Sequence, residues 1–95
     1  MMNITELRAE IDKIDGEIIP LLEKRLDTCY EIARFKARTN QPYYDEAREA
    51  EKLATIAELT RDALDDEVLE IYGEIMRICR EYQRNLMGGK DATDD

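Results

Sequence analysis

The first forty residues of this chain carry an apolar pattern that fits one long helix and strongly limits the possible folds. Apolar residues recur at alternating steps of three and four, at Ile4, Leu7, Ile11, Ile14, Ile18 and Leu21. This spacing is a heptad seam, the face that a helix turns toward a partner helix. Continued along the helix, the seam reaches Arg25 and then Lys36. Because an unpaired buried cation is costly, the pattern predicts an anion, internal or bound, opposite these two residues.

Composition narrows the class of protein further. The chain has 95 residues, of which 39% are charged, with only four glycines and two prolines, values typical of one small helix-rich domain. Its net charge of −9 makes nucleic acid and anionic membranes poor partners. The sequence has neither a signal-peptide pattern nor a stretch of 18 apolar residues. We therefore expect no nucleic-acid or membrane partner and a cytoplasmic location.

Two residue types bear on chemistry and redox state. The chain has no histidine, which removes the commonest general base and the commonest zinc ligand, and we expect no metal or other cofactor. Cys29 and Cys79 lie far apart in the sequence, at helical core positions, and form no CxxC pair. We therefore expect two free thiols in a reducing compartment rather than a disulfide.

The sequence predicts an all-α fold of three helices, of which the first is the longest. It is expected to run from about Thr5, a plausible N-cap, to Thr39, and to end at Asn40-Gln41-Pro42. Pro20 predicts a kink in this helix, because proline removes an interior hydrogen bond. Asp45 is the expected N-cap of the second helix.

The third helix is expected to begin near Asp65 or Asp66. It carries a second heptad seam, at Val68, Tyr72, Ile75, Cys79, Tyr82 and Leu86. The pair Gly88-Gly89 is expected to stop it. We interpret residues 1–87 as one domain and residues 88–95 as a disordered acidic tail.

The length of the first helix predicts an oligomer. About 35 helical residues make a rod of roughly 50 Å, whereas a compact domain of this size is only about 30 Å across. The first helix would therefore extend beyond a monomeric globule and expose its seam. Pairing of two long helices solves this problem, so we expect an intertwined homodimeric helical bundle.

Several polar residues are candidates for a site, and each also has an ordinary explanation. Arg25 and Lys36 lie on nearly one face of the first helix, yet both could extend to solvent at a dimer edge. Asp45 could be an N-cap and nothing more, and Gln83 a surface glutamine. Cys79 fits a core position better than a reactive thiol. In combination, a neutral amide, a lysine and several arginines are what a buried dianion needs.

These residues occur in an ordered set of short motifs. In chain order the motifs are Leu7-Arg8-x-x-Ile11-Asp12-x-Ile14-Asp15, Leu21-Leu22-x-x-Arg25, Ile32-Ala33-x-x-Lys36, Asp45-x-x-Arg48-Glu49 and Cys79-x-x-x-Gln83. Over roughly residues 4 to 86 the chain resembles the all-helical chorismate mutases. The resemblance implies an intertwined homodimer with two equivalent sites, and the Claisen rearrangement of chorismate to prephenate on the route to phenylalanine and tyrosine.

The resemblance also implies a role for each matching residue. It places Arg8 of one subunit and Arg25 of the other at the two substrate carboxylates, and Lys36 and Gln83 at the ether oxygen. By the same resemblance Asp45 and Glu49 lie near the ring hydroxyl, Arg48 supports the site, and Ile32 supplies an apolar wall. Cys79 stands where many relatives have serine, and its thiol is a weaker hydrogen-bond donor. Gln83 stands where some relatives have an acid that must be protonated.

Two other functions remain open from the sequence. An isochorismate pyruvate-lyase of the same fold would use a similar cationic pocket, and only product analysis separates the two. A non-catalytic helical dimerisation module would leave Arg25, Lys36 and Gln83 as ordinary edge residues. Only a true site would be stabilised by a transition-state analogue.

Overall fold

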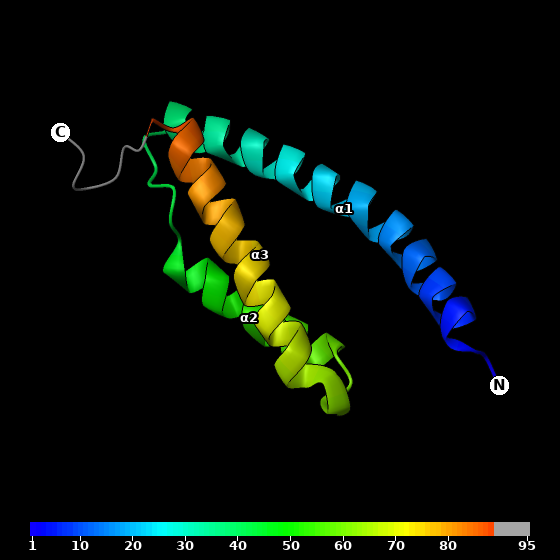
Figure 1. The fold of residues 1–95 in the computed structure, drawn as a ribbon. Coiled ribbons are helices and arrows are strands. Elements are labelled where there is room, and N and C mark those ends of the chain that lie inside the picture. Colours follow the sequence, from blue (N-terminus) through cyan, green and yellow to red (C-terminus); the bar gives the residue numbers. More distant parts are fainter. Residues whose placement is uncertain (89–95) are drawn as a thin grey trace.

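The computed structural model describes residues 1–88 and confirms an all-α architecture of three helices (Figure 1). They are α1 (Ile4–Arg38), α2 (Glu46–Leu59) and α3 (Asp65–Leu86), with a short 3₁₀ turn, η1 (Asp62–Leu64), before α3. Among the described residues no strand is present. The predicted tail from residue 88 lies, apart from Gly88 itself, outside the described residues.

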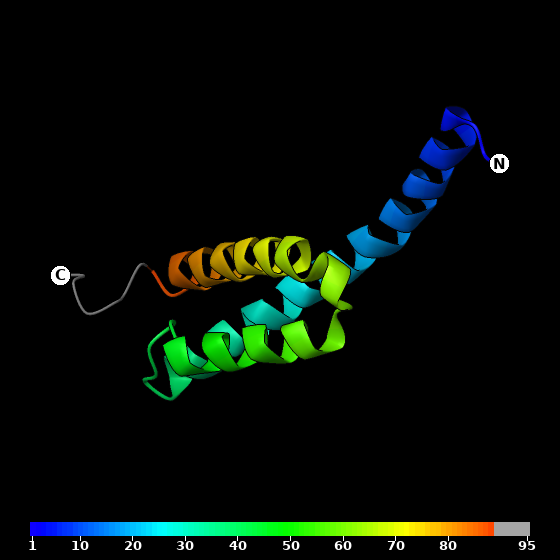
Figure 2. The same cartoon turned by 90° about the horizontal axis from the view of Figure 1, so that it is seen from below.

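Helix α1 is a single unbroken helix of 35 residues that contains Pro20 and curves along its length (Figures 1 and 2). The expected N-cap at Thr5 is wrong. Asn3 caps the helix instead, because its side chain accepts from the Glu6 amide at 2.9 Å while the Glu6 carboxylate accepts from the Asn3 amide at 3.3 Å. This reciprocal pair is a capping box, which satisfies two amides at once.

The end of α1 is closed where the sequence predicts it. Asn40 takes a left-handed conformation with φ of 56°, which asparagine tolerates better than most residues. The Gln41 amide then donates to the Lys36 carbonyl at 2.8 Å, in the pattern of a Schellman motif. The chain thereby turns directly from α1 toward α2.

The other two helices form an antiparallel hairpin, and α3 packs against both α1 and α2 (Figures 1 and 2). Asp45 is the N-cap of α2 as predicted, accepting from the Arg48 amide at 3.0 Å. The expected cap at Asp65 or Asp66 is wrong, since both residues lie inside the first turn of α3 and Leu64 occupies the N-cap position. The preceding turn η1 leads the chain into α3 without a side-chain cap.

The buried core is small and sits where α3 contacts its two neighbours. It consists of Cys29 and Ala33 from α1, Ile56 from α2, and Met76 and Gln83 from α3. On α3 the most buried residues therefore lie on the flank of the predicted seam.

The expectation of two free thiols is wrong, because Cys29 and Cys79 form a disulfide that joins α1 to α3. Fifty positions separate them in sequence, but the packing of α3 on α1 brings their Cα atoms to 6.5 Å, within the range that a disulfide spans. Distance along the chain is therefore no guide to pairing here.

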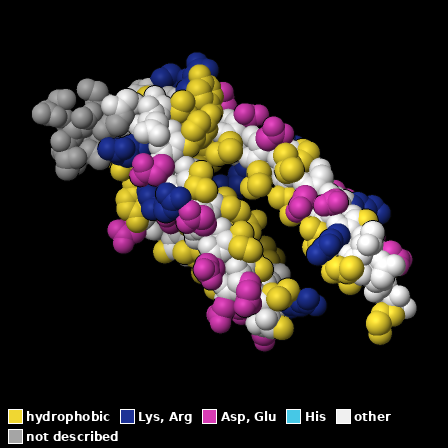
Figure 3. Space-filling view, in the orientation of Figure 1, with side chains coloured by type: hydrophobic (Ala, Val, Ile, Leu, Met, Phe, Trp, Pro, Cys, Tyr) yellow, Lys and Arg dark blue, Asp and Glu magenta, His cyan; other side chains and the backbone are white. Residues whose placement is uncertain are grey.

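The N-terminal half of α1 extends away from the hairpin and makes the molecule elongated, 59 × 25 × 19 Å with a radius of gyration of 16.9 Å (Figure 1). Its predicted seam is open to solvent: the side chains of Ile4, Leu7, Ile11, Ile14, Ile18 and Leu21 are 43–64% exposed. Figure 3 shows hydrophobic side chains on the surface along this arm. None of the described helices combines the length and apolar character that crossing a membrane requires.

Candidate active site

A cavity of about 590 Å³ lies between the three helices, within the size range of small-molecule sites. Eight of the nine residues singled out from the sequence line it, namely Arg25, Ile32, Lys36, Asp45, Arg48, Glu49, Cys79 and Gln83. Arg8 does not. The structure therefore brings together residues that are spread over nearly sixty positions of sequence.

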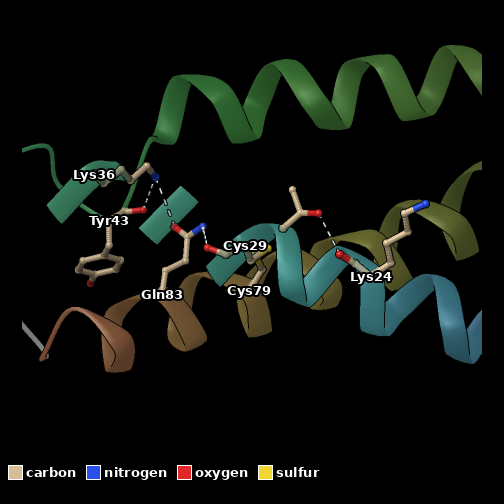
Figure 4. Close-up of a disulfide and its surroundings, with 7 residues drawn as sticks. Lys24, Cys29, Lys36, Tyr43, Cys79 and Gln83 are labelled. Atoms are coloured by element: carbon tan, nitrogen blue, oxygen red, sulfur yellow. Dashed lines mark hydrogen bonds between the residues drawn. A yellow bond between two sulfur atoms is a disulfide. The ribbon is translucent and has the colours of Figure 1, made fainter. Parts of the chain in front are cut away.

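Lys36 and Gln83, which both line the cavity, are in contact with each other (Figure 4). The Lys36 ammonium donates to the Tyr43 carbonyl at 2.8 Å and to the Gln83 amide oxygen at 3.4 Å. The Gln83 amide nitrogen donates in turn to the Cys29 carbonyl at 3.2 Å. Gln83 is only 5% exposed, so it is a buried polar residue held by two partners and not a surface glutamine.

Both groups retain donors after these contacts. An ammonium carries three hydrogens and a primary amide two. Lys36 uses two of its three in the contacts above, and Gln83 uses one of its two. The pair can therefore present one charged and one neutral donor to a single acceptor atom in the cavity.

The start of α2 contributes two acidic side chains and one basic side chain to the cavity wall. Asp45 is engaged as the helix cap. The Arg48 guanidinium pairs at 2.8 Å with Glu51, and both side chains are largely exposed. The Glu49 carboxylate is more enclosed and accepts from Arg80 of α3 at 2.6 Å. Arg48 thus lines the cavity while its charged end is directed to an exposed partner.

The wall formed by α1 combines one predicted cation with apolar surface. Arg25 is half-buried at its heptad position, so the seam cation faces a cavity and not a packed core. Ile32 lies two turns further on and is 43% exposed. These two residues give the cavity a basic part and an apolar part on the same helix.

Arg8 lies on α1, 17 positions before Arg25. At 1.5 Å per residue, this is about 25 Å of helix. Arg8 is exposed and belongs to the part of α1 that extends beyond the hairpin. Within one chain it is therefore not part of the cavity.

Cys79 lines the cavity as half of the Cys29–Cys79 disulfide (Figure 4). The expected weak thiol donor is accordingly absent in this state, because a disulfide sulfur carries no hydrogen. The hydrogen bond from the Gln83 amide to the Cys29 carbonyl lies directly beside the bridge. The redox state of one bond thus decides whether this part of the wall holds a donor.

The cavity also contains basic residues that the sequence argument missed, Lys24, Lys52 and Arg80. With Arg25, Lys36 and Arg48 they make six basic side chains against two acidic ones, Asp45 and Glu49, in a chain of net charge −9. Lys52 was detectable, since it continues the face of α2 marked by Asp45 and Arg48 at helical spacing. Arg80 gave no such signal. The cavity is a local basic region suited to a small anion.

Comparison with known proteins gives a consistent result. The family described as "Chorismate mutase type II" matches residues 7–84. A bifunctional chorismate mutase/prephenate dehydratase of Aquifex aeolicus is 31% identical over 91 residues, covering 90% of this chain and 25% of that protein. A T-protein of Haemophilus influenzae is 33% identical over 82 residues, covering 76% of this chain and 22% of that protein.

A further similar protein is named for a different enzyme activity. A 3-dehydroquinate dehydratase of Pyrobaculum aerophilum is 30% identical over 77 residues, covering 81% of this chain and 23% of that protein. The chain thus spans about a quarter of the length of each of these curated relatives. No solved structure matches the chain significantly.

Proposed function

This chain belongs to the type II chorismate mutase family, and we propose that it catalyses the Claisen rearrangement of chorismate to prephenate on the route to phenylalanine and tyrosine. The observation that carries the proposal is the contact of Lys36 with Gln83 in a cavity whose charged lining residues are mainly cations. That arrangement suits a dianionic substrate in which negative charge develops on one oxygen in the transition state of the rearrangement.

The chemistry of the reaction fits these residues. A pericyclic rearrangement needs no nucleophile, no metal and no proton transfer, so a site without histidine can support it. The enzyme must hold a flexible dianion in its reactive chair conformation, which is catalysis by positioning. It must also direct donors at the ether oxygen, where negative charge develops as the C–O bond breaks. Lys36 and Gln83 are those donors in our proposal.

The remaining residues have supporting roles in the proposal. Arg25 binds one substrate carboxylate, and Arg8 of the partner subunit binds the other. Glu49 and Asp45 lie near the ring hydroxyl, and Arg48 supports this side of the site. Ile32 packs against the apolar part of the ring. Cys79 contributes a weak donor only when its thiol is reduced.

We further propose that the active protein is an intertwined homodimer. The exposed seam on the N-terminal half of α1 supports this, because six large apolar side chains along one helix favour a partner surface. The position of Arg8 supports it as well, since a second copy of α1 would bring this residue to a cavity that its own chain cannot reach. A cytoplasmic location is part of the same proposal.

The test is a continuous assay of chorismate absorbance with purified protein, together with identification of the product. Saturable conversion to prephenate supports the proposal. A folded dimer that leaves chorismate unchanged but releases pyruvate from isochorismate would instead be the lyase. A dimer that acts on neither, and whose melting temperature a chorismate transition-state analogue leaves unchanged, would be a dimerisation module.

A further inference from the structure

We propose that Arg80 is a positioning residue of this site: it neutralises Glu49 and holds the first turns of α2 against α3. The inference rests on the proposed function, because it concerns binding of the same dianion. The resemblance to the chorismate mutases assigned no role to Arg80.

The first observation is the ion pair between Arg80 and Glu49. Arg80 Nη1 lies 2.6 Å from Glu49 Oε1, and the two side chains are only 27% and 25% exposed. By comparison, the side chains of the surface pair Arg48–Glu51 are 62% and 70% exposed. Because screening by water falls with burial, the Arg80–Glu49 pair interacts more strongly than this surface pair. Both of its members line the cavity.

The second observation is a cation–π contact at the start of α2. The Arg80 guanidinium lies 4.8 Å from the centroid of the Tyr44 ring, a distance at which the ring attracts the cation. Tyr44 directly precedes Asp45, the cap of α2. Arg80 thus makes one contact with Tyr44, just before α2, and one with Glu49, in the first turns of α2.

The charge of Glu49 explains why the site needs this residue. A carboxylate in a cavity that binds a dianion repels its ligand unless a cation compensates it. Arg80 supplies that compensation and still leaves Glu49 with acceptor capacity for a hydroxyl group, since a carboxylate has two oxygens. Removal of Arg80 would leave an uncompensated negative charge in the wall.

This repulsion has a specific kinetic signature. The two carboxylates of chorismate keep their charge throughout the rearrangement, so an uncompensated Glu49 repels the substrate and the transition state about equally. A loss of such uniform binding raises KM and leaves kcat nearly unchanged. A residue that acted on the breaking bond would instead lower kcat.

The experiment compares Arg80→Gln, Arg80→Lys and the double variant Arg80→Gln/Glu49→Gln with the wild type. We expect Arg80→Gln to raise KM about tenfold with kcat within about threefold, and Arg80→Lys, which keeps the charge, to raise KM less. The double variant should have a lower KM than Arg80→Gln, because it removes the uncompensated charge. Arg77→Gln is the matched control: Arg77 also pairs with a glutamate, Glu74, but on the exposed surface of α3, outside the cavity.

Each outcome decides something. Circular dichroism confirms folding of each variant, and Arg80→Lys carries the test if Arg80→Gln does not fold. If Arg80→Gln behaves as Arg77→Gln does, or if Arg80→Lys is as impaired as Arg80→Gln, the positioning role is wrong while the proposed function stands. A double variant with the same KM as Arg80→Gln also overturns it, since Arg80 would then bind substrate directly. A wild type that does not convert chorismate overturns the proposed function and this inference together.

Discussion

Lys36 of α1 and Gln83 of α3 are 47 positions apart in sequence, yet the Lys36 ammonium lies 3.4 Å from the Gln83 amide oxygen. Each is also tied to a backbone carbonyl, Lys36 to that of Tyr43 and Gln83 to that of Cys29. Donors that are already held in place need no reorganisation when charge develops on a ligand. This preset pair is the basis of the first two predictions.

Replacing Lys36 by alanine should remove the charged donor to the ether oxygen. By analogy with the loss of one oxyanion-hole donor, we expect kcat to fall about 10²- to 10³-fold. The assay is loss of chorismate absorbance, with circular dichroism to show that the fold is retained. Arg38→Ala is the control, since Arg38 is an exposed cation in the same last turn of α1. Near wild-type turnover in Lys36→Ala would exclude the proposed site.

Gln83 predicts a flat pH profile. Its amide does not titrate, so we expect kcat/KM of the wild type to change little from pH 5 through neutral to mildly alkaline pH. Gln83→Glu should behave differently, because only a protonated carboxyl can donate to the ether oxygen, and its activity should rise as pH falls. Rate profiles of both proteins over this range make the comparison. A steep loss of wild-type activity between pH 5 and 7 would contradict the role of Gln83.

Arg8 offers a test of shared sites. Arg8→Ala and Lys36→Ala should each be nearly inactive, but a mixture refolded together should recover about a quarter of wild-type activity. Half of the dimers in an equal mixture are mixed, and one of their two sites then contains both wild-type residues. Activity of the refolded mixture against that of the separate variants gives the answer. Failure to recover activity would show that Arg8 does not act across subunits.

The disulfide predicts a redox-dependent stability. A bridge that spans 50 positions stabilises the fold by about 4 kcal/mol in the chain-entropy description. We therefore expect dithiothreitol to lower the melting temperature of the wild type but not of Cys79→Ser.

The Cys79→Ser variant should stay active, because its hydroxyl is a good donor. Cys79→Ala has no donor at this position and should bind substrate more weakly than Cys79→Ser. An inactive but folded Cys79→Ser would show that the sulfur has a role of its own.

The helices are largely predictable from the sequence because their determinants are local. Heptad spacing, the cap at Asp45 and the left-handed residue Asn40 each act within a few residues. The two differences at helix starts are local as well: Asn3 and Glu6 form a capping box that begins the helix just before the expected start at Thr5, and a 3₁₀ turn displaces the expected cap near Asp65.

The interior contacts are less predictable because they depend on how helices pack. The disulfide joins α3 to α1 and the Arg80–Glu49 pair joins α3 to α2. The spacing of residues along a single helix predicts neither contact. The membership of the cavity followed from the resemblance, while the ordinary explanation of Gln83 as a surface residue failed because α3 turns that face toward α1. What each cavity residue does to a substrate stays a prediction.

The overhang of α1 has a consequence for how activity depends on the amount of protein. Arg8 lies about 25 Å of helix away from Arg25, so a lone chain has no complete site in the proposed arrangement. Specific activity should then fall on dilution once the protein concentration drops below the dissociation constant of the dimer. At such concentrations the rate would become second order in protein. In a cell that also makes a chain inactivated at Lys36, each mixed dimer would keep only one of its two sites.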